Sequence, residues 1–220
     1  MLPFKDREEA GKELALALVE FRGRDVIVLG MPRGGVVVAR EVAEWLGAPL
    51  DIVVTRKIGA PGEPEFALGA ITQEGDLIVD RGAAESVGAS AEYLQEEARR
   101  KRLEVKDRTR SLRGDTPYPS LGGKTVIIVD DGMATGNSMR AAVQSVRKRV
   151  PKEVVVAVPV APSETVAELT REGVRVVCPE RPRSFFAIGE FYKDFEQVED
   201  SEVRELLQSA WKGRSLKSAA

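Results

Sequence analysis

The sequence VIIVDDGMATGNS, residues 126–138, places four aliphatic residues directly before two aspartates and a loop of small residues. The aliphatic run predicts a buried strand. Because an unpaired carboxylate is costly to bury, Asp130 and Asp131 are expected where this strand leaves the sheet and meets water, a metal ion or the hydroxyls of a ligand. The stretch therefore indicates the edge of a binding site.

The composition limits the classes of protein to which the chain can belong. With 220 residues, of which 43% are hydrophobic and 31% charged, it can bury the core of one large or two small domains. Its 33 basic and 35 acidic residues nearly balance, so no overall positive field favours nucleic acid or an anionic membrane. No apolar run approaches the roughly 20 residues of a membrane span, and the N-terminus lacks the pattern of a secretion signal. These features predict a cytoplasmic protein.

Two residue types are scarce or missing, which narrows the chemistry. The chain has one cysteine, Cys178, and no histidine. An internal disulfide is therefore excluded, as are a histidine-ligated zinc site and a Ser-His-Asp triad.

Short β-rich runs alternate with helical stretches, which predicts an α/β fold with a mostly parallel sheet flanked by helices. The expected strands of this sheet are residues 25–30, 51–57, 125–131, 153–160 and 174–180. The expected helices are residues 6–22, 36–46, 138–150, 163–173 and 201–212. Residues 58–66 are expected to be an irregular Pro- and Gly-rich loop, followed by a strand pair around residues 73–76. We expect a single domain over residues 1–220.

Residues 89–113 are dense in Arg, Lys and Glu and predict a long, solvent-exposed helix. Acidic residues interleave with the basic ones, which favours a solvated helix face over a nucleic-acid patch. Residues 83–113 are therefore interpreted as a helical insert.

The unusual loops all follow predicted strands. In an open α/β sheet, ligands bind at the carboxyl ends of the strands, so residues 31–35, 55–62, 130–138 and 178–186 are expected to converge. Gly132 and Gly136 permit a tight loop whose backbone amides start a helix, and the hydroxyls of Thr135 and Ser138 complete a cradle for a phosphate. The aspartate pair suits vicinal sugar hydroxyls or a hydrated Mg²⁺, although two such residues could also be ordinary turn or capping acids.

As a whole, residues 126–138 resemble the phosphoribosyl-pyrophosphate (PRPP) signature of type I phosphoribosyltransferases. The resemblance implies that Asp130 and Asp131 bind the ribose 2- and 3-hydroxyls and hold Mg²⁺ through water or PRPP. It also implies that the residues of the following loop surround the 5-phosphate, namely Ala134, Thr135, Gly136, Asn137 and Ser138.

Residues 31–35, MPRGG, look like the pyrophosphate loop of the same family. There a non-proline peptide, often cis, presents backbone amides together with a basic side chain, and the bond from Pro32 to Arg33 is the candidate. Gly34 and Gly35 complete the loop. The stretch could also be an ordinary strand-to-helix turn or a degenerate dinucleotide fingerprint, but no G-x-G-x-x-G is present.

Two further segments are similar to parts of the family. Arg56 and Lys57 precede a Pro/Gly loop similar to the mobile catalytic loop, although a surface basic pair would look the same. Residues 179–200 are similar to the hood of hypoxanthine-guanine enzymes, which implies base binding by Phe186 and Asp194. An aromatic run is, however, also typical of a protein core.

Two departures from the family pattern concern the acceptor and the insert. At the position of Ala134, 6-oxopurine enzymes have an acidic residue, whereas adenine and orotate enzymes, like this chain, do not. The identity of the acceptor base therefore stays open. The insert at residues 83–113 has no clear counterpart in the short enzymes, and we expect a dimer contact or a lid.

The resemblance implies transfer of the 5-phosphoribosyl group from PRPP to a nitrogenous base or similar nitrogen nucleophile, with release of pyrophosphate. Arg33, Arg56, Lys57 and Asp131 are the implied catalytic residues, Mg²⁺ the cofactor and a homodimer the expected assembly. No nucleic-acid or membrane partner is expected. A PRPP-sensing regulator without turnover is the alternative, and a flavodoxin-like phosphosugar-binding enzyme is a third possibility.

Overall fold

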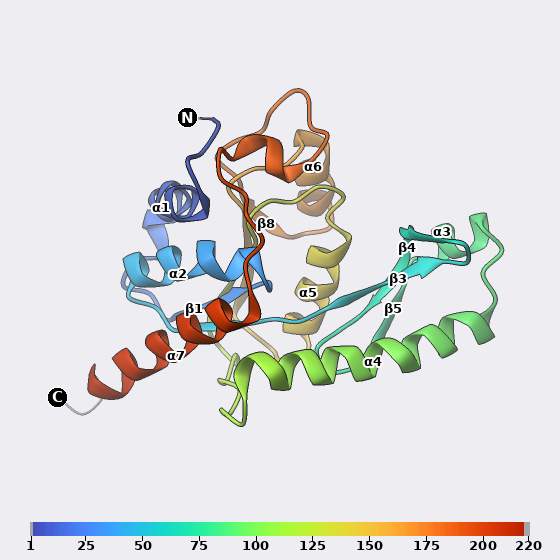
Figure 1. Cartoon of the computed structure of the whole chain (residues 1–220), viewed down its shortest axis with the longest axis horizontal. Coiled ribbons are helices and arrows are strands. Elements are labelled where there is room, and N and C mark those ends of the chain that lie inside the picture. The colour runs from blue at the N-terminus through green and yellow to red at the C-terminus, as the bar shows by residue number, and fades with distance from the viewer. Residues whose placement is uncertain (1, 218–220) are drawn as a thin grey trace.

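The computed structural model describes residues 2–217 and has a central sheet of five parallel strands (Figure 1). Their order across the sheet is β2-β1-β6-β7-β8. The strands are β1 (Val26–Gly30), β2 (Leu50–Ile52), β6 (Thr125–Val129), β7 (Glu153–Ala157) and β8 (Arg175–Val177). Every residue of β1 and β6 is buried, as expected for a parallel sheet covered on both faces. The predicted fold class is confirmed, while the predicted domain also includes residues 1 and 218–220, which lie outside the described residues.

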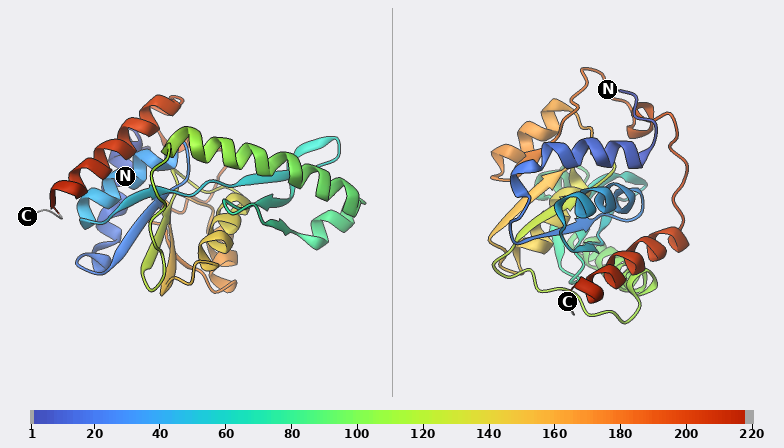
Figure 2. Two further views of the ribbon diagram at one scale, coloured as in Figure 1. Left: turned by 90° about the horizontal axis from the view of Figure 1, so that it is seen from below. Right: turned by 90° about the vertical axis from the view of Figure 1, so that its left-hand side faces the viewer.

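Helices cover both faces of this sheet (Figures 1 and 2). The first layer contains α1 (Arg7–Ala17), α2 (Gly34–Leu46) and α7 (Asp200–Lys217), and a short helix, η1 (Val19–Phe21), follows α1. The second layer contains α5 (Asn137–Arg147) and α6 (Ser163–Arg171). Within residues 2–217, no helix is both long and apolar enough to cross a membrane.

A second sheet and two helices form an arm, residues 56–113, which projects from the central sheet (Figures 1 and 2). Its antiparallel strands are β3 (Arg56–Ala60), β4 (Glu63–Ile71) and β5 (Leu77–Val79), and its helices are α3 (Arg81–Ser86) and α4 (Ala91–Arg113). Helix α4 buries Ala98, Val105 and Leu112 in the same apolar cluster as Ile58 and Leu68 of the arm strands. The polar insert is therefore an amphipathic helix with a narrow buried stripe.

The structure corrects two boundaries that the sequence suggested. The strand expected at residues 51–57 is too long, because pairing with β1 ends at Ile52 and the chain then leaves the central sheet before β3 begins at Arg56. The irregular loop expected at residues 58–66 is also wrong, because most of it forms the β3–β4 hairpin. Register shifts on both sides of Gly59 interrupt the regular alternation by which a strand is read from sequence. A Cβ at Gly59 would lie 2.4 Å from the carbonyl oxygen of Pro64, so glycine is needed at this close approach.

The segment 179–200, which we call the hood, packs against the N-terminus. It is irregular apart from η2 (Ile188–Phe191) and Asp200, with which α7 begins. The backbone amide of Phe4 donates to the Phe191 carbonyl at 2.8 Å, and the Lys193 amide donates to the Phe4 carbonyl at 2.8 Å. Phe4, Phe191 and Tyr192 are buried together in a small apolar cluster. These contacts hold the hood over the carboxyl end of the sheet.

Candidate active site

The strand order places a topological switch point between β1 and β6. The chain leaves β1 through α2 and returns to β2 on one side, whereas it leaves β6 through α5 and returns to β7 on the other side. In α/β sheets the crevice that binds ligands lies at such a switch point, which here is at the carboxyl ends of β1 and β6. Residues 31–35 and 130–138 follow these two strands and both lie at this crevice.

The loop after β1 lies directly against the aspartate pair. A Cβ added to Gly34 would lie 1.9 Å from Asp131 Oδ2, and one added to Gly35 would lie 2.6 Å from Asp130 Oδ1. Both glycines are thus required by the approach of the two loops. The peptide bond between Pro32 and Arg33 is cis, as predicted for a pyrophosphate loop.

The two carboxylates share a buried environment. The Asp131 amide donates to Asp130 Oδ1 at 2.9 Å. Burial, together with the charge of Asp131, raises the pKa of Asp130 well above its usual range. Burial also raises the pKa of Asp131, although a hydrogen bond from Arg7 opposes this change. A hydroxyl donor or a cation that binds this pair would stabilise the ionised carboxylates, which burial disfavours.

Arg7 is a site residue that the sequence analysis missed. Its Nε lies 2.7 Å from Asp131 Oδ2, and its Nη1 donates to the Glu196 carbonyl at 2.8 Å. Its guanidinium carbon lies 3.9 Å from the centroid of the Phe195 ring. The side chains of Arg7 and Asp131 are only 11% and 13% exposed. Arg7 therefore links α1, the hood and the end of β6, and no local pattern around it indicates this role.

The loop after the aspartates begins α5. Its N-cap is Gly136, which has a φ of 76° and provides no side-chain cap. The first amides of the helix are therefore left without a side chain that caps them. The Thr165 hydroxyl donates to the Ala134 carbonyl at 2.7 Å, and Arg140 Nη1 donates to the Thr135 carbonyl at 2.9 Å. These bonds fix the loop predicted to hold a phosphate, with Asn137 and Ser138 in the first turn of the helix.

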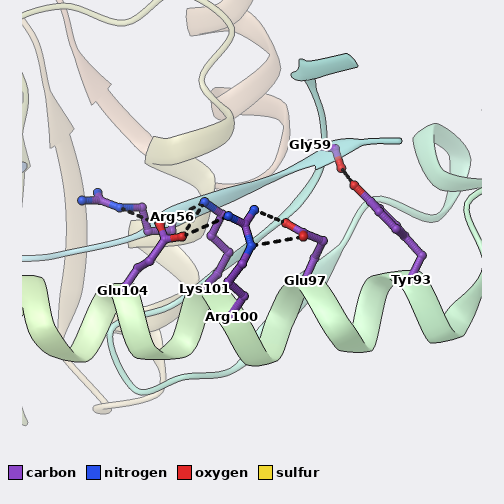
Figure 3. Close-up of polar contacts among 7 residues, drawn as sticks. All are labelled: Arg56, Gly59, Tyr93, Glu97, Arg100, Lys101 and Glu104. Carbon is purple, nitrogen blue, oxygen red and sulfur yellow. Dashed lines mark hydrogen bonds and ion pairs between the residues drawn. The ribbon is translucent and has the colours of Figure 1, made fainter. Parts of the chain in front are cut away.

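Arg56 and Lys57 begin β3 at the base of the arm. The Thr55 hydroxyl, one residue earlier, lies 3.5 Å from the Ser138 carbonyl oxygen, so this base adjoins the loop after β6. Arg56 Nε lies 3.8 Å from Glu104 Oε2 of α4 (Figure 3). Burial lowers the pKa of Arg56, and the charge of nearby Arg108 lowers it further. The loops after β1 and β6 and the base of the arm thus meet at one edge of the molecule.

In the hood, the residues that touch this edge are not those named from sequence. Phe186 is 84% exposed, and the Asp194 carboxylate accepts a hydrogen bond from the Glu196 amide at 3.2 Å. A Cβ added to Gly132 would lie 2.6 Å from the Ile188 side chain, so Ile188 covers the start of the loop after β6. Tyr192 donates its hydroxyl to the Asp131 carbonyl at 2.5 Å. The base-binding roles of Phe186 and Asp194 stay predictions.

The donor set fits a weakly held Mg²⁺. Within residues 2–217, no group of three or more His, Cys, Asp or Glu side chains could hold a metal ion on its own. Asp130 and Asp131 supply carboxylate oxygens at the crevice, and Mg²⁺ commonly binds through one or two carboxylates together with water and substrate phosphates. These residues therefore suit a metal ion that arrives with a phosphorylated ligand.

Comparison with known proteins identifies the family. The family described as "Phosphoribosyl transferase domain" matches residues 4–195, and this chain belongs to it. Two Mycobacterium tuberculosis proteins, from strains CDC 1551 / Oshkosh and H37Rv, are provisionally named phosphoribosyl transferases and are each 40% identical to this chain over 207 residues. The matched region covers 94% of this chain and 47% of each relative, so the chain spans about half the length of these relatives.

A solved structure has the same fold. The crystal structure of the protein TT1426 from Thermus thermophilus is 45% identical to this chain, with a TM-score of 0.81. The match covers 94% of this chain and 99% of that one. Together with the family match over residues 4–195, this likeness assigns the chain a type I phosphoribosyltransferase-like fold.

Proposed function

We propose that the chain transfers the 5-phosphoribosyl group of PRPP to a nitrogen nucleophile, with release of pyrophosphate. The observation that carries this proposal is the contact between the cis-peptide loop and the acidic pair. Gly34 and Gly35 lie against Asp131 and Asp130, so a ligand in the crevice would meet both loops at once. PRPP has a diphosphate and vicinal hydroxyls on adjacent ribose carbons and therefore suits this arrangement.

The protein's part in the reaction is to position the substrate and balance its charge. The C1–O bond to pyrophosphate breaks with its electron pair on the leaving oxygen, and the lone pair of the acceptor nitrogen forms the new C1–N bond. Asp130 and Asp131 would hold the ribose hydroxyls, and residues 134–138 the 5-phosphate. Arg33, Arg56 and Lys57 would balance the charge of the departing pyrophosphate, and Asp131 would stabilise positive charge on the ribose. When bound, Mg²⁺ would further neutralise the pyrophosphate.

Ligand binding is the first test. Mg²⁺ with PRPP should raise the melting temperature, because a ligand that binds only the folded state at about 100 times its Kd adds roughly 2.7 kcal/mol. For a chain of this length that corresponds to roughly 5–10 °C. Ribose 5-phosphate should give a smaller rise, since it lacks the diphosphate. An unchanged melting temperature with millimolar PRPP would contradict the proposal.

Turnover is the second test. Release of pyrophosphate from PRPP should be measured with a panel of purines, pyrimidines and small amines. Lys57→Ala should slow release, whereas Arg110→Gln, at an exposed position of α4, should not. Binding without release for any acceptor would support the regulatory alternative instead. The acceptor, the homodimer and the cytoplasmic location stay predictions.

A further inference from the structure

Two arginines from distant parts of the chain converge on one carboxylate beside the cis-peptide loop. Arg33, in that loop, has its Nη1 3.8 Å from Asp200 Oδ1. Arg108, on α4 of the arm, donates to Asp200 Oδ2. Asp200 is the first residue of α7, and its Oδ1 is buried without a hydrogen-bond partner among the described residues. One oxygen of Asp200 thus accepts a hydrogen bond, while the other has a long contact with Arg33 and, within residues 2–217, no hydrogen bond.

More positive charge surrounds this carboxylate than it can balance. The hydrogen bond from Arg108 lowers the pKa of Asp200, and the charges of Arg33 and Arg204 lower it further. Arg56 lies close enough for its pKa to be lowered by the charge of Arg108. Its own ion pair is with Glu104 on α4. Four arginines therefore gather around two carboxylates, and such a surplus favours binding of a multiply charged anion.

Helix α4 is fixed to the arm strands, which holds Arg108 in place. The Tyr93 hydroxyl donates to the Gly59 carbonyl at 2.9 Å, and Arg56 and Lys101 both pair with Glu104 (Figure 3). The buried stripe of α4 adds apolar contacts along the same helix. The position of Arg108 beside the loop after β1 is thus supported by packing over the length of the insert.

We propose that Asp200 is an internal counter-ion that occupies the place of a diphosphate, and that Arg108 of the arm joins Arg33 in binding that diphosphate. This inference rests on the proposed function. A carboxylate offers two oxygens to two guanidinium groups, whereas a diphosphate offers more oxygens and more charge to the same groups. An incoming diphosphate would therefore displace Asp200 and satisfy Arg33, whose contact with Asp200 is long.

Binding of inorganic pyrophosphate, measured by calorimetry at fixed ionic strength, tests both residues without the transfer reaction. Asp200→Asn keeps the shape of the side chain but removes its charge, so the Kd for pyrophosphate should fall about tenfold. Glu202→Gln removes the same charge from an exposed position in the same turn of α7 and is the matched control, with little change in Kd expected. A purely structural role of Asp200 would not tighten binding.

Arg108→Gln should weaken binding of pyrophosphate about tenfold, because one charge-assisted hydrogen bond is lost. Arg110→Gln removes a charge two residues away on the same helix and should leave the Kd nearly unchanged. Melting temperatures of all variants establish that each is folded. The inference is wrong if the unmodified protein binds pyrophosphate and PRPP but each variant has the same Kd for pyrophosphate as its control, that is, Asp200→Asn the same as Glu202→Gln and Arg108→Gln the same as Arg110→Gln. In that case the proposed function still stands. If the unmodified protein binds neither ligand, the proposed function itself fails.

Discussion

Replacement of Arg7 by Met should destabilise the protein strongly, because it leaves the Asp131 carboxylate buried without its cation. The Arg7–Asp131 pair has an Nε–Oδ2 distance of 2.7 Å, and both side chains are nearly nine-tenths buried. Removing one partner of a buried pair costs about 3–5 kcal/mol, and the slight exposure of this pair favours the lower value. A loss of about 3 kcal/mol would lower the melting temperature by roughly 6–12 °C for a chain of this size.

Arg175→Met provides the matched control. Arg175 pairs with Glu20 at the surface, where both side chains are 41% exposed, so its loss should cost at most about 1 kcal/mol. Scanning calorimetry compares the two variants, and measurements on Arg7→Met, Asp131→Asn and the combined variant give the coupling energy between Arg7 and Asp131. If Arg7→Met melts within 2 °C (about 1 kcal/mol or less) of Arg175→Met, or if the double variant is additive, the buried-pair reasoning is refuted.

The effect of Arg7→Met on the melting temperature should also depend on pH. Burial raises the pKa of Asp131 even with Arg7 present, and loss of Arg7 raises this pKa further. The stabilisation by the pair is therefore complete above the pKa of Asp131 in the variant and is lost as the pH falls to the lower pKa of Asp131 beside Arg7. A protonated Asp131 needs no cation. The difference in melting temperature between the unmodified protein and Arg7→Met should therefore shrink in acid, whereas an effect due only to lost packing against Phe195 would persist.

Three further substitutions or treatments test the site and the core. Asp130→Asn should raise the melting temperature at pH 7 by about 2–4 °C, which corresponds to about 1 kcal/mol, because burial raises the pKa of Asp130 and its ionised form destabilises the fold. This gain should disappear in acid, where Asp130 is protonated. A lower melting temperature of the variant at pH 7 would contradict the prediction. Gly34→Ala should lower the free energy of unfolding, measured by denaturant titration, by about 1–3 kcal/mol, because its Cβ would lie 1.9 Å from Asp131 Oδ2. Gly122→Ala is the control and should be nearly neutral, because its Cβ would have no neighbour closer than 3.9 Å. Cys178 is 6% exposed and burial raises the pKa of its thiol to about 11, so iodoacetamide at pH 8 should label it only after unfolding. Mass spectrometry measures the labelling, and rapid labelling of the folded protein would contradict this prediction.

Most of the central sheet could be predicted, because β1, β6 and β7 are short and almost entirely apolar. Residues 125–129 are all buried and pair with β1 on one side and β7 on the other, so polar side chains are disfavoured there. The arm was predicted less well, because its hairpin is irregular at Gly59 and its strands are only partly buried. The sequence could identify Arg56 and Lys57 as a basic pair. It could not show that the chain leaves the central sheet and enters the second sheet just before them, because this depends on where pairing with β1 stops. That stop is a tertiary effect and leaves no local signal.

The two halves of the candidate site differ in how the sequence encodes them. The half expected to hold ribose 5-phosphate comes from one continuous segment, residues 130–138, in which the order of acids, glycines and hydroxyls is itself the pattern. The half expected to hold the diphosphate takes Arg33, Arg56 and Arg108 from three elements, with Asp200 from a fourth. Taken one at a time, Arg108 and Asp200 look like ordinary surface charges, and Arg7 is equally unremarkable in sequence.

This difference has a physical basis in the chemistry of each half. Recognition of a sugar phosphate needs backbone amides at a helix start and two acceptors at a strand end, all of which a single strand–loop–helix connection supplies. Balancing a diphosphate needs several cations around one point, and like charges that close together repel unless other parts of the fold hold them there. The buried stripe of α4 and the Asp200 carboxylate provide that restraint here. A charged insert that resembles a solvated helix in sequence is therefore the element that allows Arg108 to lie beside the loop after β1.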